Sequence, residues 1–174
     1  HTEKGTVSVN TENIFPIIRK WLYSDQDIFL RELVSNATDA IAKLKRLSQM
    51  GEAEGLENEK YRIQVIYDKT AQTLTIEDNG IGMTADEIRT YINQIAFSGA
   101  MDFVEKYKEK GAETTGIIGH FGLGFYSAFM VADLVRIDTL SYKPGSEAAS
   151  WQSEDGMAYE MGASDRTSRG TSIT

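Results

Sequence analysis

The chain has 174 residues and a mass of 19.4 kDa, which is the size of one ordinary domain. Hydrophobic residues make up 41% of the chain and only 2 residues are proline, so intrinsic disorder is excluded. The formal net charge of -8 argues against binding of nucleic acid or of an anionic membrane surface. The absence of cysteine excludes a disulfide framework, a zinc-thiolate site and a cysteine nucleophile.

The ends of the chain predict that residues 1–174 are a single domain excised from a longer protein. His1 is not an initiator methionine, and the last residues form a β-prone segment that stops without a turn. The sequence contains no apolar run of membrane-spanning length and no basic-then-apolar signal peptide at its start. We therefore expect a cytoplasmic protein.

Apolar periodicity predicts the elements of the first half of the chain. A short strand at 7–9 is followed by a helix at 14–22, a longer helix at 24–48, a polar loop at 51–60 and a hairpin with strands at 63–67 and 74–78. Thr84 and Glu87 have the spacing of a helix capping box, and a helix is expected to follow through Ile95.

The second half is predicted to contain a glycine-rich segment and then mostly strands. The predicted elements are a short charged helix at 102–110, a short buried helix at 125–131, and strands at 134–142, 149–153, 158–161 and 170–174. Strands and helices do not alternate throughout, which disfavours a doubly wound parallel sheet. The predicted fold class is α+β, a two-layer α/β sandwich in which a mixed, mostly antiparallel sheet is covered on one face by helices.

The long helix has a polar stripe formed by Glu32, Asn36, Asp39 and Lys43. We expect this stripe to lie opposite the apolar side of the helix. It is either a solvated helix face or a ligand-binding surface. In the second case, the small neighbour Ala40 would let a ligand or the sheet approach the stripe closely. Oxygen ligands of this kind suit magnesium, which takes few protein ligands and adds phosphate oxygens.

The strand that ends at Asp78 continues into Asn79-Gly80-Ile81-Gly82-Met83. A carboxylate at the end of a strand, beside a glycine-containing backbone, could accept hydrogen bonds from an exocyclic amine. A plain Asn-Gly turn is an equally good interpretation of the same residues.

A glycine-rich segment at 116–125 precedes the short buried helix. It lacks the ending of a Walker loop, and its glycines do not follow a strand as a dinucleotide-binding fingerprint requires. Such a segment either presents backbone N–H groups to an anion or is a mobile loop.

Three motifs in this order, Glu-x-x-x-Asn-Ala-x-Asp-Ala at 32–40, Asp-x-Gly-Ile-Gly-Met at 78–83 and Gly-x-Phe-Gly-x-Gly-Phe-Tyr-Ser at 119–127, resemble the ATP-binding domain of the heat-shock protein 90 chaperones. The bacterial branch, high-temperature protein G, is the most similar. Trp151 and Arg169-Gly170-Thr171 extend the resemblance over almost the whole chain. The superfamily also contains type II topoisomerases, mismatch-repair proteins and histidine kinases, and it implies a Bergerat-type ATP-binding fold.

The resemblance implies a role for particular residues. Glu32 would be the catalytic residue, orienting or deprotonating the attacking water, and Asn36 would hold Mg²⁺. Asp78 would accept the adenine amino group of ATP or ADP, assisted by Gly82 and Thr171 through water. The other implied nucleotide-binding residues are Asp39, Lys43, Ile81, Met83, Ile92, Gly119, His120, Phe121, Gly122, Leu123, Gly124 and Phe125. Residues 98–124 would form a lid over the nucleotide.

The sequence departs from the family pattern near the nucleotide. Tyr91 stands where some relatives have a ribose-contacting Asn, Phe97 where Lys is usual, and His120 where Gln is usual. The family's catalytic arginine lies in a following domain, so the isolated chain is expected to hydrolyse ATP slowly or not at all.

The leading hypothesis is an ATP-binding and ATP-hydrolysing domain of a chaperone, an ATPase whose nucleotide state drives lid closure and clamping of a homodimer around client proteins. One alternative is a nucleotide-sensing module that never turns over. Another is a topoisomerase or mismatch-repair relative with a DNA-binding region downstream, which the net negative charge of the chain disfavours.

Overall fold

The computed structural model describes residues 2–6, 28–94 and 124–174. The predicted strand at 7–9, the helices at 14–22 and 102–110, and all of the predicted lid except Gly124 lie outside the described residues.

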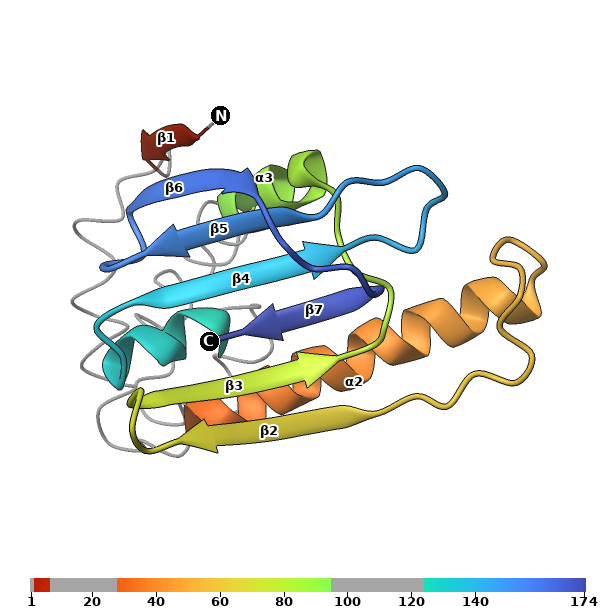
Figure 1. Cartoon of the computed structure of the whole chain (residues 1–174), viewed down its shortest axis with the longest axis horizontal. Helices are drawn as coiled ribbons and strands as arrows, with labels where there is room; N and C mark the ends of the chain where they lie inside the picture. Colours follow the sequence, from red (N-terminus) through yellow and green to blue (C-terminus); the bar gives the residue numbers. More distant parts are fainter. Residues whose placement is uncertain (1, 7–27, 95–123) are drawn as a thin grey trace, which may run out of the picture.

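Seven strands and three helical segments make up the described chain (Figure 1). In chain order these are β1 (Glu3–Thr6), α2 (Ile28–Gln49), β2 (Ile63–Asp68), β3 (Thr73–Asp78), α3 (Ala85–Gln94), the 3₁₀ segment η2 (Gly124–Met130), β4 (Val135–Leu140), β5 (Ala149–Ser153), β6 (Ala158–Ala163) and β7 (Gly170–Ile173). The long helix, the hairpin, α3, the short helical segment and the later strands are therefore confirmed over the described residues, and the predicted helical positions 24–27 and 95 lie outside them.

The strands form one sheet in the order β1-β6-β5-β4-β7-β3-β2. Every pairing among the described strands is antiparallel, so the mostly antiparallel sheet predicted from the sequence contains no parallel pair in this part of the chain. The last strand, β7, lies between β3 and β4. Thr171 consequently has Asp78 opposite it on one side and Thr139 on the other.

The helices cover one face of the sheet, which confirms the predicted α+β class (Figure 1). We call this the inner face and the opposite one the outer face. Helix α2 buries residues at helical spacing, including Leu33, Ala37 and Leu44. The core against which the helices pack includes Ile76, Ile137 and Trp151.

Helix α3 begins with the predicted capping box. The Thr84 amide donates to Glu87 Oε1 over 2.9 Å, and the Glu87 amide donates to Thr84 Oγ1 over 3.2 Å. These reciprocal bonds satisfy two backbone donors that the first turn of a helix leaves without an intrahelical acceptor. Because the cap fixes where α3 begins, it also fixes the turn at 78–83 that leads into it.

An aromatic cluster on the inner face joins η2 to β5. Trp151 is 1% exposed, and the Phe125 ring meets it edge to face with 5.7 Å between ring centroids. Phe129 approaches the same indole at 6.5 Å. Aromatic pairs of this kind stabilise a core by more than the burial of their apolar area accounts for. The contact with Trp151 holds Phe125 in place beside a cavity on the inner face.

Candidate functional site

A cavity of about 730 Å³ lies between α2, α3 and the inner face of the sheet. Nine of the residues proposed from the sequence line it: Asn36, Asp39, Lys43, Asp78, Ile81, Gly82, Met83, Phe125 and Thr171. Its other lining residues are Leu33, Ala37, Ala40, Ile76, Asp86, Glu87, Thr90, Tyr91, Ile137 and Ile173.

Asp78 is the buried carboxylate of this cavity, and its residue is only 6% exposed. Its Oδ1 accepts a hydrogen bond from the Gly80 amide over 2.8 Å. Burial raises the pKa of the carboxyl to about 6, although the backbone N–H groups of Gly80 and Thr171 and the charge of Arg166 act in the opposite direction. At neutral pH the group is ionised and is a strong acceptor for a donor placed in the cavity.

The turn after Asp78 is packed closely on both sides. A Cβ on Gly80 would lie 2.7 Å from the Ala40 carbonyl carbon, and the Ile81 amide donates to the Ala40 oxygen over 3.1 Å. Gly82 has a φ of +65°, and a Cβ there would overlap the Leu140 carbonyl oxygen. The two glycines are therefore required by the packing of this turn, and Ala40 gives the close approach predicted from its small side chain.

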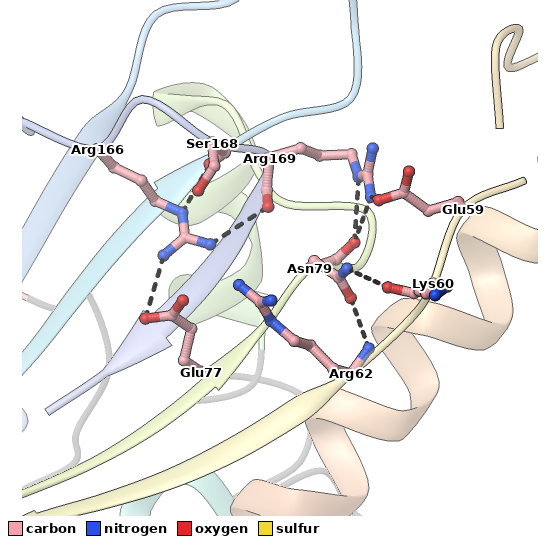
Figure 2. Close-up of a pocket in the computed structure, with 8 residues that line it drawn as sticks. All are labelled: Glu59, Lys60, Arg62, Glu77, Asn79, Arg166, Ser168 and Arg169. Atoms are coloured by element: carbon pink, nitrogen blue, oxygen red, sulfur yellow. Dashed lines mark hydrogen bonds and ion pairs between the residues drawn. The ribbon is translucent and has the colours of Figure 1, made fainter.

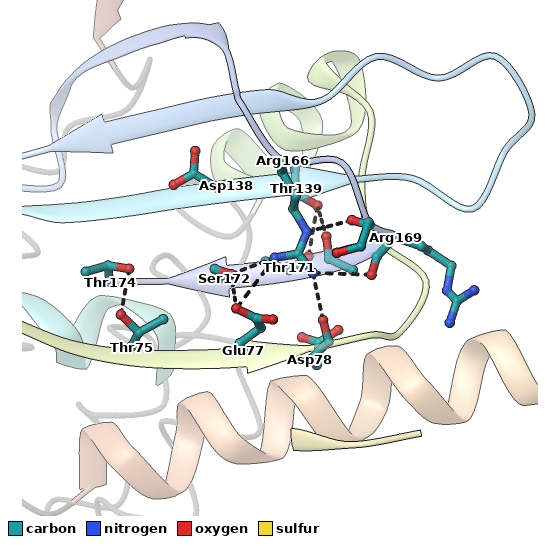
Figure 3. Close-up of polar contacts among 12 residues, drawn as sticks. Thr75, Glu77, Asp78, Asp138, Thr139, Arg166, Arg169, Thr171, Ser172 and Thr174 are labelled. Atoms are coloured by element: carbon teal, nitrogen blue, oxygen red, sulfur yellow. Dashed lines mark hydrogen bonds and ion pairs between the residues drawn. The ribbon is translucent and has the colours of Figure 1, made fainter. Parts of the chain in front are cut away.

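Thr139 and Thr171 form a hydroxyl pair beside Asp78 (Figure 3). Their Oγ1 atoms are 2.9 Å apart, and Thr139 Oγ1 also accepts from the Met83 amide over 2.9 Å. This pair links the end of β7 to the turn that precedes α3. Thr139 is buried and was not identified from the sequence, where it is only one polar residue in an alternating strand.

Helix α2 supplies both polar and apolar side chains to the cavity. Asn36, Asp39 and Lys43 line it together with Leu33 and Ala37. The polar stripe thus borders the apolar side of the helix, and the expectation that it lies opposite is wrong. Asn36 lies three positions after Leu33, and Lys43 lies three positions after Ala40. A three-residue step turns a helix by only about 60° net, so each pair shares one side of the helix.

Three groups of predicted site residues are not among the residues that line the cavity. Glu32 is half-buried on α2 and is not among the cavity-lining residues; burial raises its pKa, and Arg31 opposes this. Ile92 is buried in the core cluster and does not line the cavity either. Gly124 is the first residue of η2, and residues 119–123 lie outside the described part of the chain.

Tyr91, noted from the sequence only as a departure at a ribose-contacting position of some relatives, lines the cavity. Burial raises the pKa of its phenol, and the charge of Asp39 acts in the same direction. Ile76 and Ile173 could have been found by strand periodicity, because they are two positions from Asp78 and Thr171 and share their face. Nothing in the sequence indicated Ile137.

The described residues contain no cluster of three or more His, Cys, Asp or Glu side chains able to hold a metal ion. None of the described helices has the length and apolarity needed to cross a bilayer.

The cavity can bind a flat heterocycle with an amine at its edge. Its walls are largely apolar, and Asp78 offers a buried, ionised acceptor at the end of a strand. Asn36, Asp39 and Lys43 then place polar groups along the α2 side, where a more polar portion of the ligand would lie.

Comparison with known proteins identifies a family for this arrangement. Residues 24–160 match the family described as histidine kinase-, DNA gyrase B- and HSP90-like ATPase. This range includes the α2 motif, Asp78 and Phe125, and so covers most of the residues that form the cavity.

Two of three individual relatives are named as chaperones. The chain is 50% identical over 172 residues to the chaperone protein HtpG of Porphyromonas gingivalis, and 53% identical over 171 residues to that of Bacteroides fragilis. It is 38% identical over 174 residues to the mitochondrial TNF receptor-associated protein 1 homolog of Dictyostelium discoideum. These alignments cover 98% or 99% of the chain but only 24% or 25% of each relative. The chain thus spans about a quarter of the length of these relatives.

Proposed function

The chain belongs to the histidine kinase-, DNA gyrase B- and HSP90-like ATPase family, in its HSP90 branch, and from this premise we propose that the cavity binds ATP and ADP with adenine against Asp78. The observation that carries the proposal is the buried Asp78 carboxylate. An ionised acceptor pairs with the amino group of adenine, whereas guanine would present its O6 acceptor at the equivalent position. Thr171 is paired with Asp78, and Gly82 lines the same cavity; both would complete the contacts around the base through water.

The α2 side of the cavity fits a nucleotide with magnesium. Asn36 offers an amide oxygen, and magnesium typically takes one or two protein ligands and completes its shell with phosphate oxygens and water. The ion would supply neutralisation of phosphate charge. Asp39 and Lys43 would lie near the ribose and the mouth of the cavity.

Glu32 is the proposed catalytic residue. It lies one helical turn before Asn36, and its raised pKa suits a group that orients or accepts a proton from water. Residues 119–125 are proposed to bind the phosphates through backbone amides, and residues 98–124 to close over them.

The activity of the whole protein is a proposal that rests on the relatives. We infer that the chain is a single ATPase domain of a longer cytoplasmic chaperone, which acts as a homodimer on client proteins. Its relatives are named as chaperones, which favours this function over that of a topoisomerase or a mismatch-repair protein.

Calorimetric titration of magnesium-ADP into the chain tests the adenine assignment. We expect binding by the wild type and a loss of at least about 100-fold in affinity in Asp78→Asn, because the amide cannot replace an ionised acceptor. Asp133→Asn, an exposed carboxylate outside the cavity, is the matched control and should bind like the wild type. Equal affinity in wild type and Asp78→Asn would refute the assignment.

Steady-state hydrolysis by the full-length protein tests turnover. Glu32→Ala should abolish ATP hydrolysis while leaving ADP affinity nearly unchanged, because its role is in the attack of water. The same rate in both proteins would favour the alternative of a nucleotide-sensing module.

A further inference from the structure

A second cavity, of about 410 Å³, opens on the outer side of the sheet directly behind Asp78 (Figure 2). It lies at the ends of β2, β3 and β7 and is lined by polar and charged side chains, including Glu59, Arg62, Glu77, Asn79, Arg166 and Arg169. Two of its arginines contact the same backbone segment that carries the adenine acceptor on the inner side.

Arg166 holds the carbonyl of Asp78. Its Nη2 donates to the Asp78 oxygen over 3.1 Å and to the Arg169 oxygen over 3.2 Å. Its Nη1 donates to Ser172 Oγ over 2.7 Å and lies 3.9 Å from Glu77 Oε2. The side chain is only 8% exposed, so these contacts fix a desolvated guanidinium group in one orientation.

Arg169 holds the next two carbonyls. Its Nε donates to the oxygens of Asn79 and Gly80 over 3.1 and 3.2 Å, and its Nη2 donates to Asn79 O over 2.8 Å. Glu59 Oε1 accepts from the same Nη2 over 2.6 Å and keeps the guanidinium group in place. Together the two arginines bind three successive carbonyls, at positions 78, 79 and 80.

The Asn79 side chain attaches the same segment to the start of β2. Its Oδ1 accepts from the Arg62 amide over 2.9 Å, and its Nδ2 donates to the Lys60 oxygen over 2.8 Å. The Asp78–Gly80 backbone is thus bound from the outer side by three side chains, while the Asp78 carboxyl projects into the nucleotide cavity on the inner side (Figures 2 and 3).

We propose that Arg166 and Arg169 are positioning residues for adenine recognition, which hold the backbone of the Asp78 turn from the outer face so that its carboxylate meets the adenine amino group. The inference rests on the proposed nucleotide function. Both guanidinium groups are bound to this chain's own carbonyls and carboxylates, and we therefore assign them to the turn and not to a second ligand. A planar guanidinium group can reach two carbonyls at once, which a single ammonium group cannot do in the same geometry.

Affinities for ADP and for inosine diphosphate, measured in the same magnesium buffer, test the proposal. Inosine diphosphate keeps the phosphates but has a carbonyl oxygen where adenine has its amino group. In Arg169→Lys we expect ADP affinity to fall about tenfold and inosine diphosphate affinity to stay unchanged, because a small displacement of Asp78 affects only the adenine contact. Arg166→Lys should have the same effect.

Arg62→Ala is the matched control. Arg62 lines the same outer cavity, but its guanidinium group has no hydrogen bond or ion pair to any described residue, so both affinities should stay at the wild-type value. Conservative lysine variants are used because they keep the charge of a buried site, and circular dichroism would check their folding.

The possible outcomes separate this proposal from the proposed function. Unchanged ADP affinity in both lysine variants would overturn the positioning role, as would a parallel loss of affinity for both nucleotides, which indicates a general structural effect. If the wild type bound neither nucleotide, or bound both equally, the proposed adenine site itself would be wrong.

Discussion

The two faces of the β3–β7 pair differ in what surrounds their polar side chains. On the inner face, Asp78 and Thr171 lie among apolar side chains such as Ile76 and Ile173, and the carboxylate is left for a ligand. On the outer face, Glu77 and Ser172 are bound to Arg166 and to each other (Figure 3). The inner face carries the carboxylate proposed to recognise adenine, and the outer face holds the backbone of that residue in place.

This difference follows from the two-residue period of a strand. Asp78 and Glu77 are adjacent in sequence and point to opposite faces. The Asp78 carboxyl is contacted by backbone N–H groups, whereas the Glu77 carboxyl is bound to the side chains of Arg166 and Ser172. Burial raises the pKa of Asp78, which has no ion pair with a described residue.

The largest expected contrast between the faces is in stability, at two adjacent positions of β5. Trp151→Ala should lower the free energy of unfolding by about 4 kcal/mol, because it removes a fully buried inner-face ring. Gln152→Ala, on the outer face, should cost less than about 1 kcal/mol, although it removes the acceptor of Arg136. Urea unfolding of both variants would measure the contrast, and similar losses would contradict it.

The next effect concerns the cost of leaving Asp78 without an ion pair. Its folded pKa of about 6 lies above the ordinary value of 3.8 for an aspartate carboxyl, so the folded state binds the proton more tightly than the unfolded state, and stability falls as pH rises between these values. At 1.36 kcal/mol per unit, Asp78→Asn should be more stable than the wild type by roughly 3 kcal/mol at pH 8.

Urea unfolding across a pH series would check this prediction. Most of the difference between the proteins should be lost at pH 4.5, since the wild-type carboxyl is then protonated in the folded state. Asp133→Asn, measured across the same pH series, is the control for the substitution itself. A variant that is less stable than the wild type at pH 8 would show that Asp78 stabilises the fold.

The smallest effect is expected for an outer-face ion pair in water. Lys4 Nζ lies 3.5 Å from Glu160 Oε1, and the two side chains are 77% and 46% exposed. Lys4→Ala should change the free energy of unfolding by less than about 0.5 kcal/mol, because solvent screens the pair. Thermal unfolding would test this, and a larger loss would mean that the outer face stabilises the fold even where it is exposed.

Local elements of the fold could be predicted from the sequence. The apolar spacing of α2, the alternation of β2 and β3, and the Thr84–Glu87 cap each depend on residues a few positions apart. The order of the strands could not be predicted in this way. No periodicity indicates that β7 inserts between β3 and β4, because that choice depends on which surfaces pack best over the whole sheet.

The site was partly predictable for the same reason. Asp78 and the polar residues of α2 lie within short motifs, so their types and spacing were visible in the sequence. Tyr91 and Ile137 reach the cavity only through tertiary packing. The contacts of Arg166 with backbone carbonyls leave no pattern in the sequence, since a carbonyl belongs to every residue.

The place of β7 has a consequence for how the protein is made. Thr75 and Thr174 share a hydrogen bond although they are 99 positions apart, and β7 supplies all of the pairing between β3 and β4 in the described sheet. Contacts between such distant positions form slowly. While residues 170–173 are still inside a ribosome, the emerging chain has two unjoined parts of a sheet, each with an open edge, and Thr171 is not beside Asp78. The proposed adenine site would therefore arise only with β7, and a nascent chain that lacks this strand would not be stabilised by the nucleotide.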